Sequence, residues 1–155
     1  MPLVKRSQAV LIVLKTKDIC SALTIKRHHL RMWTDSLQPY CSQNTQERSA
    51  RKFDTGDLMY FATIKHIEDK FGIPVSKLSD ISKSIYDTIR SPRIMSNQEL
   101  IYLNFESNKC LFADSLEKKA EGLLIDTTCV KNLVCEFLGL IPKQSELHLG
   151  LTRVS

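Results

Sequence analysis

The stretch TKDICSALTIKRHHLRMWTD, residues 16–35, contains two short helical patterns separated by a break. In the first pattern, Asp18 lies near a helix start, and Ile19, Ala22 and Leu23 follow it at helical spacing. We therefore expect one short helix in the segment TKDICSAL.

A second helix is expected after the break, from about Lys26 to Asp35. Leu30, Trp33 and Leu37 would lie along one stripe of this helix and face the core. Trp33 is interpreted as a core anchor rather than as a platform on which bases stack. Two short helices joined by a tight turn have the outline of a helix-turn-helix motif.

The opposite side of the second helix is cationic, because it carries Lys26, Arg27, His28 and Arg31. Arg27 and Arg31 are four residues apart, and like charges at this spacing destabilise an isolated helix by about 0.2–0.5 kcal/mol. A phosphate between the two guanidinium groups would turn that cost into a gain. The alternative is an ordinary solvated helix face, and for His28 and His29 it is an ordinary surface or half-buried histidine.

Positive charge is concentrated in the front part of the chain. The 155 residues have a formal net charge of +5. Residues 1–95 contain 16 Lys and Arg against 9 Asp and Glu, whereas residues 96–155 contain 6 against 8. This distribution favours an acidic partner for the front part.

The composition, with 43% hydrophobic and 25% charged residues, is that of a soluble globular protein of one or two domains. The apolar run from Ala9 to Leu14 is shorter than the core of most secretory signals and far shorter than the roughly 20 residues of a membrane span. We interpret it as a buried strand of a cytoplasmic protein.

Five cysteines form an odd set without the spacing of zinc ligands, at positions 20, 41, 110, 129 and 135. The expectation is small buried thiols in a reducing compartment, and the alternative is a thiol or metal sensor.

A polar, exposed loop is expected at residues 38–50, followed by the short extended segment RKFD. The next helix has Asp54 or Thr55 as its cap and ends at Gly72. Its expected apolar stripe consists of Leu58, Phe61, Ile64, Ile67 and Phe71. Pro74 opens a further helix, whose expected inward residues are Leu78, Ile81, Ile85 and Ile89.

The pattern changes after a boundary near residues 91–97. ELIYLNF and CLFAD indicate a β-hairpin, and GLLID indicates a further strand. TTCVKNLVCEFLGL indicates a helix, capped by Thr127 or Thr128 and ended by Gly139. The expected apolar positions of that helix are Val130, Leu133, Val134, Phe137 and Leu138. The prediction is an α+β protein with two domains, at residues 1–93 and 97–155.

The order of these elements resembles the MerR family of winged helix-turn-helix DNA-binding proteins. The matching residues are Asp18-Ile19, Leu23, Ile25, Leu30-Arg31-x-Trp33, Arg51-x-Phe53, Asp57-Leu58, Gly72 and Leu78. The resemblance covers about residues 10–90. Thr24 stands where the family often has glycine, and Lys26 stands where serine commonly caps the second helix. The long dimerisation helix of the family is missing after residue 91.

The resemblance implies an N-terminal winged helix-turn-helix followed by a small α+β unit that dimerises or senses a signal. The second helix would enter the major groove, and the loop and wing would contact the neighbouring backbone or minor groove. The candidate DNA-binding residues are Lys26, Arg27, His28, Arg31, Arg48, Arg51 and Lys52.

These features predict a sequence-specific transcriptional regulator of the nucleoid that acts as a homodimer on double-stranded DNA, with RNA polymerase as a further partner. The alternatives are an excisionase-like or architectural DNA-binding protein of a mobile element, and a protein-interaction module whose basic helix is incidental. Glycine-rich phosphate loops, nucleophile elbows and clustered carboxylates are lacking in the sequence. We therefore expect neither enzymatic activity nor a cofactor or metal.

Overall fold

The computed structural model describes residues 12–43, 50–92, 98–113 and 121–139. The described elements of this α+β protein are, in chain order, β1 (Leu14–Lys15), α1 (Thr16–Leu23), α2 (Arg27–Ser36), the 3-10 helix η1 (Tyr40–Ser42), β2 (Lys52–Phe53), α3 (Thr55–Phe71), α4 (Val75–Leu78), α5 (Ser82–Arg90), β3 (Leu100–Asn104), β4 (Lys109–Phe112), β5 (Leu123–Asp126) and α6 (Thr128–Phe137). The expected α+β class is confirmed.

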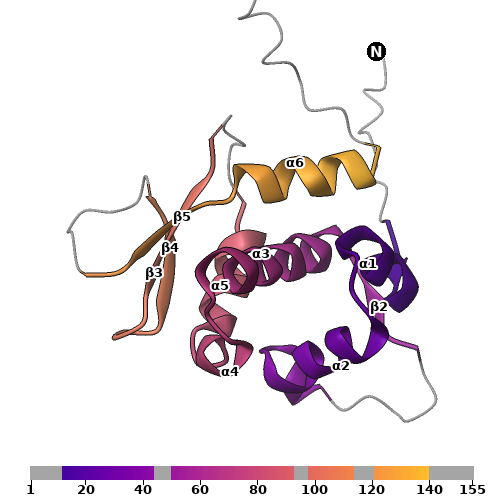
Figure 1. Ribbon diagram of the computed structural model, residues 1–155, viewed down its shortest axis with the longest axis horizontal. Helices are drawn as coiled ribbons and strands as arrows, with labels where there is room; N and C mark the ends of the chain where they lie inside the picture. The colour runs from indigo at the N-terminus through magenta and orange to yellow at the C-terminus, as the bar shows by residue number, and fades with distance from the viewer. Residues whose placement is uncertain (1–11, 44–49, 93–97, 114–120, 140–155) are drawn as a thin grey trace, which may run out of the picture.

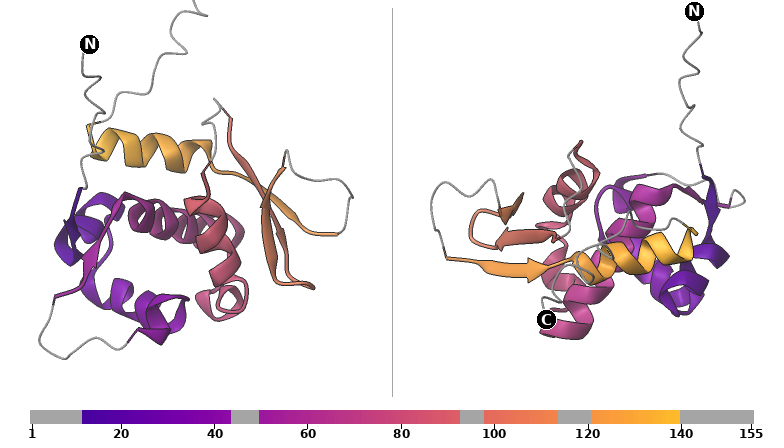
Figure 2. Two further views of the ribbon diagram at one scale, coloured as in Figure 1. Left: turned by 180° about the vertical axis from the view of Figure 1, so that it is seen from behind. Right: turned by 90° about the horizontal axis from the view of Figure 1, so that it is seen from above.

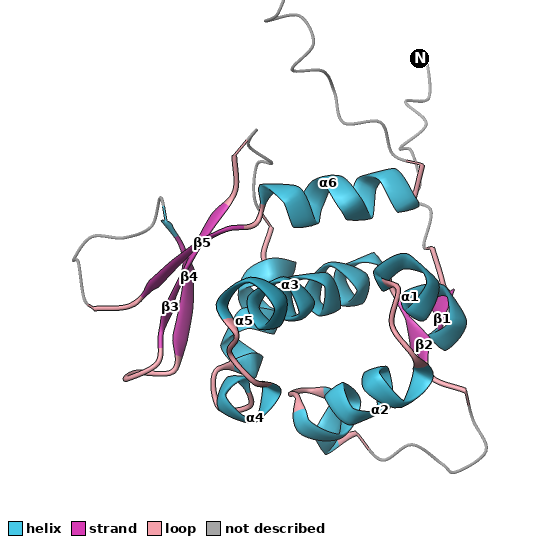
Figure 3. Cartoon of the chain, viewed as in Figure 1, coloured by secondary structure: helices cyan, strands magenta, loops and turns pink. Residues whose placement is uncertain are grey.

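Two small antiparallel sheets lie at opposite ends of the helical part (Figures 1 and 3). β1 pairs with β2, with Leu14 opposite Phe53. The other sheet has the order β4-β3-β5, in which Tyr102 lies opposite Leu111 on one side and Leu124 on the other. The expected hairpin and third strand are confirmed, whereas residues 9–11 of the expected first strand lie outside the described residues.

The two helices expected in residues 16–35 are confirmed, as α1 and α2. Thr24 closes α1 in the left-handed conformation, with φ of 54°, and the Ile25 N–H donates to the Cys20 carbonyl oxygen over 3.0 Å. Leu30, Trp33 and Leu37 are all buried, as the stripe predicts. The chain therefore turns within three residues and presents one side of α2 to the core.

α3 runs through the centre of the molecule, with α6 along one side and α2 on the opposite side (Figures 1 and 2). It ends at Gly72, where a φ of 63° favours a residue without Cβ. The first four residues of its predicted stripe are fully buried, but Phe71 is exposed. The prediction for Phe71 was wrong because its side chain lines an open surface cavity beside the start of α6 instead of a closed core.

An aromatic cluster fills the space between α2, α3, β2 and α5. Its members are Trp33, Tyr40, Phe53, Tyr60, Phe61 and Tyr86. Phe61 is central, because its ring centroid lies 6.0 Å from that of Trp33 and 4.9 Å from that of Tyr40. The expectation of a wholly exposed loop at residues 38–50 was therefore wrong at Tyr40, which is buried in η1.

The single helix expected after Pro74 is divided into α4 and α5 by a turn. Ser82 begins α5 and is fully buried, because its Oγ accepts a hydrogen bond from the Gln38 N–H over 3.0 Å. All four residues predicted to point inward are buried, so the apolar pattern survives the change of direction.

The C-terminal elements pack against the N-terminal helices. α6 lies along α3, and the Cys110 N–H of β4 donates to Ser84 Oγ of α5 over 2.8 Å. Thr88 Oγ1 of α5 donates to the Cys110 carbonyl oxygen over 2.8 Å. Buried apolar residues from both parts belong to one core cluster. The division at residues 93–97 stays a prediction.

Among the residues that the structure describes, every helix is too short or too polar to cross a membrane.

Candidate nucleic-acid interface

The outer side of α2 is cationic and exposed to solvent. Lys26, Arg27, His28 and Arg31 are all exposed, whereas Leu30 on the inner side is buried. The basic side of the helix is therefore on the surface, as the periodicity predicts. α6 lies on the far side of α3 from α2 (Figure 1).

The inner side of α2 holds the helix firmly in place. Trp33 is fully buried and its ring stacks on that of Phe61 with an interplanar angle of 10°. The imidazole of His29 lies edge-on to Trp33, with ring centroids 4.6 Å apart. Its Nε2 lies 3.6 Å from Glu68 Oε2 of α3. His29 therefore belongs to the α2–α3 packing, unlike its neighbour His28.

The N-terminus of α2 lacks both a side-chain cap and an acidic residue in its first turn. Lys26 is the N-cap residue, and Arg27 and His28 follow it. Because the first N–H groups of a helix carry partial positive charge, this arrangement adds positive charge where a negative charge would be favourable. An anion such as phosphate matches both the exposed N–H groups and the cationic side chains.

The candidate residues around β2 differ in exposure. Lys52 is exposed, whereas Arg51 is half-buried with its Nη1 3.5 Å from the Tyr40 carbonyl oxygen. Through this contact Arg51 faces η1, whereas Phe53 of β2 is buried in the core. Arg48 lies outside the described residues, so the structure places six of the seven candidate residues.

The start of α3 contains a polar network that the sequence analysis did not identify. Asp54 caps the helix by accepting from the Asp57 N–H, and Asp57 accepts in return from the Asp54 N–H, both over 2.8 Å. Arg90 of α5 donates from Nη1 to Asp54 Oδ1 over 2.6 Å, and the Tyr40 hydroxyl donates to Asp57. Gly56 leaves space for Arg90, because a Cβ there would lie 2.3 Å from Nη1.

These contacts change the pKa values of the two carboxyl groups in opposite directions. The hydrogen bonds from Arg90 hold the pKa of Asp54 well below its usual range. Burial raises the pKa of Asp57, although its hydrogen bond from Tyr40 acts against that change. The sequence predicts Asp54 or Thr55 as the cap of this helix, but Tyr40 and Arg90, which complete the network, are too distant in sequence for local patterns to reveal.

The cysteines do not all fit the expectation of buried thiols. Cys110 is buried, but Cys41 and Cys129 are exposed. Cys129 Sγ lies 3.7 Å from Nδ1 of His66. No group of three potential metal ligands occurs within the described parts of the chain.

Comparisons of the chain with protein-family models, with curated proteins and with solved structures gave no significant match. The resemblance to the MerR family therefore stays a prediction from the residues themselves.

Proposed function

We propose that the protein binds double-stranded DNA in a sequence-specific manner and regulates transcription. The observation that carries this proposal is the exposed cationic side of α2, formed by Lys26, Arg27, His28 and Arg31, on a helix whose other side is buried. A helix held in this way can enter a groove without losing its packing. The absence of an acidic cap at its N-terminus supports an anionic partner.

The major groove of B-DNA, about 12 Å wide, admits an α-helix. In the proposed complex, the N-terminal half of α2 lies in the groove, and Lys26, Arg27 and His28 reach base edges or nearby phosphates. Guanine offers N7 and O6 as acceptors for Arg or Lys. Arg31, one turn further along, binds a backbone phosphate and fixes the register.

The β1–β2 pair would act as the wing of a winged helix-turn-helix. Lys52 is exposed on β2 and is suited to contact the backbone or minor groove beside the site of α2. Arg51 supports the wing from within through η1, and Arg48 remains a proposed DNA contact.

The C-terminal sheet is the proposed dimerisation surface. Leu111 and Leu124 are exposed and flank Tyr102 on one face of the sheet. This sheet lies at the end of the molecule away from β1 and β2 (Figure 1). Two copies joined there would each leave α2 free, and contact of such a DNA-bound dimer with RNA polymerase is part of the same proposal.

A second candidate function is DNA bending or architecture, as in excisionase-like proteins. It is favoured by the length of α5, which has only 9 residues and is too short for the coiled coil of the resembled family. A promoter-reporter measurement separates the two functions. Regulation predicts that promoter output changes with the protein, whereas an architectural role predicts bending without that change.

Selection of bound duplexes from a random DNA pool tests the binding itself. The proposal predicts an enriched motif, with two-fold symmetry if the protein binds as a dimer. The double variant Arg27→Gln/Arg31→Gln should bind that motif about tenfold to a hundredfold more weakly, which corresponds to a loss of about 1.4–2.8 kcal/mol for the two contacts together. The control Lys77→Gln/Lys83→Gln removes the same charge from exposed positions on α4 and α5 and should bind almost normally. An unenriched pool would contradict the proposal.

A further inference from the structure

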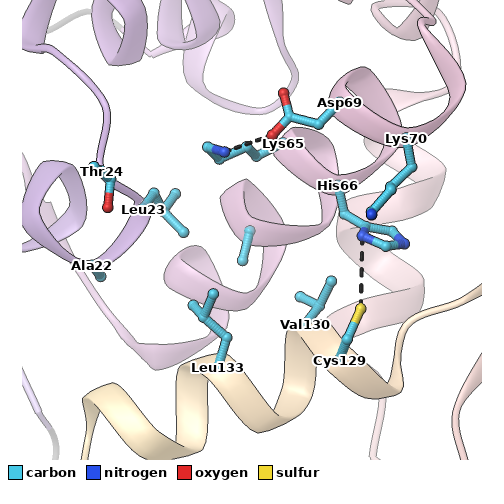
Figure 4. A pocket seen from close by; sticks show the side chains of 11 residues that line it. Ala22, Leu23, Thr24, Lys65, His66, Asp69, Lys70, Cys129, Val130 and Leu133 are labelled. Carbon is cyan, nitrogen blue, oxygen red and sulfur yellow. Dashed lines mark hydrogen bonds and ion pairs between the residues drawn. The ribbon is translucent and has the colours of Figure 1, made fainter.

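A cavity of about 300 Å³ lies between the end of α1, the second half of α3 and α6 (Figure 4). Leu23, Ala62, Val130 and Leu133 form its apolar lining. Cavities of this size are at the lower end of the range that binds small molecules in proteins. An apolar part of a ligand would therefore find a matching surface here.

The polar rim of this cavity carries one positive charge that remains uncompensated. Lys65 Nζ lies 2.6 Å from Asp69 Oδ2, so these two charges neutralise each other. Lys70 also lines the cavity and takes part in none of the ion pairs between described residues. Burial and the neighbouring Lys70 lower the pKa of His66, which keeps that imidazole neutral at pH 7. The rim thus favours a ligand with a single negative charge.

A second, more open cavity of about 660 Å³ adjoins the first and shares His66, Lys70 and Cys129 with it. It adds the hydrogen-bonding side chains of Thr128 and Asn132, and the carboxylate of Asp126, whose negative charge offsets that of Lys70 in this second space. The apolar space therefore opens toward a polar space, and Lys70 lies between them.

We propose that the first of these cavities binds a small monocarboxylate with an apolar body. The body would occupy the space lined by Leu23, Ala62, Val130 and Leu133, and the carboxylate would pair with Lys70. A cation would be repelled by Lys70, and an inorganic anion would leave the apolar lining without a partner.

The cavity also touches the turn that positions α2. Ala22, Leu23 and Thr24 belong to its lining, and Thr24 is the C-cap residue of α1 in the left-handed conformation. A bound carboxylate would restrain this turn, which precedes Arg27 by only three residues. The expected effect of the ligand on DNA affinity rests on the proposed function. The binding of the ligand to the cavity does not depend on that function.

Isothermal titration calorimetry of the full chain with four probes tests the ligand class. The probes are octanoate, octan-1-ol, octyltrimethylammonium and acetate. Octanoate should bind at one site, octan-1-ol more weakly and octyltrimethylammonium most weakly of the three, and acetate should give no saturable binding. Equal binding of the three octyl compounds, or no binding of octanoate, would overturn the proposal.

Two variants with matched controls locate the site. Lys70→Gln should weaken octanoate binding by up to about fivefold, as expected for loss of an exposed ion pair, and Lys77→Gln should leave it unchanged. Leu133→Gln should weaken it by about fivefold or more through loss of apolar contact. Phe137→Gln is the control, since Phe137 has similar exposure on the same helix, 40% against 43%, and does not line either cavity.

Cysteine alkylation by iodoacetamide gives an independent readout that does not depend on a variant. Peptide mass spectrometry should show that octanoate protects Cys129, which lines both cavities, but not the exposed Cys41 in η1. Equal alkylation of Cys129 with and without octanoate would place the ligand elsewhere and overturn the assignment.

The same titration distinguishes failure of this inference from failure of the proposed function. Binding of octanoate to a protein that does not bind DNA would remove the function and leave the ligand site intact. If DNA is bound, octanoate should change its affinity in the native protein and much less in Lys70→Gln. An unchanged DNA affinity at saturating octanoate would contradict only the proposed effect of the ligand on DNA binding, and not the ligand site.

Discussion

The N-termini of α3 and α2 differ in how their first backbone N–H groups are satisfied. α3 begins with Asp54 and Asp57, which satisfy each other's backbone N–H groups and connect to Arg90 and Tyr40. α2 begins with Lys26, Arg27 and His28 and has no side-chain cap. The N-terminus of α3 is therefore capped by the protein's own side chains, whereas the positive potential at the N-terminus of α2 is directed at solvent.

This difference indicates what each helix end contributes. The α3 start joins α3, α5 and η1, so changes there should alter the free energy of unfolding. The α2 start carries exposed charges, and the buried Trp33 packs the other side of this helix against the core. Changes at the α2 start should therefore alter DNA binding with little loss of stability.

The largest effect on stability is expected for Asp57→Ala. The substitution removes the acceptor of the Tyr40 hydroxyl and of the Asp54 N–H, and leaves a buried hydroxyl without that partner. The free energy of unfolding should fall by about 2–3 kcal/mol, measured by urea denaturation. A loss below about 0.5 kcal/mol would show that the network does not stabilise the α3 start.

Arg90→Gln should have a smaller effect, which depends on pH. Arg90 and Asp54 are partly exposed, so at neutral pH the expected loss is about 1 kcal/mol. Because Arg90 lowers the pKa of Asp54 in the folded protein, this stabilisation is present above the unfolded pKa of about 4 and is lost as the pH falls through the folded pKa. The difference between native and variant stability should therefore shrink below about pH 4.

The matched control for Arg90 is Lys83→Gln, in an exposed pair with Asp87 one turn away on the same helix. It should cost no more than about 0.5 kcal/mol. Equal losses in the free energy of unfolding for the two variants would mean that the Arg90–Asp54 pair stabilises the protein no more than an ordinary surface ion pair.

Lys26→Asp converts the α2 start into a capped helix end. Its extended backbone, with φ of −86° and ψ of 156°, suits an N-cap residue. The variant should gain about 0.5–1 kcal/mol of stability, while DNA binding weakens because a carboxylate then occupies the place proposed for phosphate. Thermal denaturation and fluorescence anisotropy with duplex DNA measure the two effects. Unchanged DNA affinity would separate the α2 start from binding.

The smallest effect is expected for Asp18→Ala in α1. Asp18 Oδ2 accepts from the Lys15 N–H over 2.8 Å, but this hydrogen bond is exposed and has no further network attached to it. The expected loss is about 0.5 kcal/mol, again measured by urea denaturation. A loss as large as that of Asp57→Ala would show that the connections to Arg90 and Tyr40 add nothing to a local cap.

The sequence predicted the elements whose signals are local. The apolar spacing of Leu30, Trp33 and Leu37 placed the buried side of α2, and Asp54 and Gly72 marked the two ends of α3. The alternation in residues 100–112 likewise predicted the hairpin.

Other features depend on contacts between distant segments, so local patterns could not reveal them. Tyr40 lies in a polar stretch and is buried only because α3 supplies Asp57 and Phe61. The position of Phe71 depends on which neighbours reach the end of α3. The cavity beside Lys70 requires α1, α3 and α6 to meet, which no local pattern indicates.

The salt dependence of DNA affinity tests the central claim most directly. Duplex DNA of the selected sequence would be titrated at a series of salt concentrations with the native protein and with Arg27→Gln/Arg31→Gln. Five or six phosphate contacts predict a slope of log affinity against log salt of about −4.5 to −5.5, reduced in magnitude by up to about 2 in the variant. A slope near zero, or the same slope for both proteins, would contradict the assignment of α2 as the DNA-binding helix.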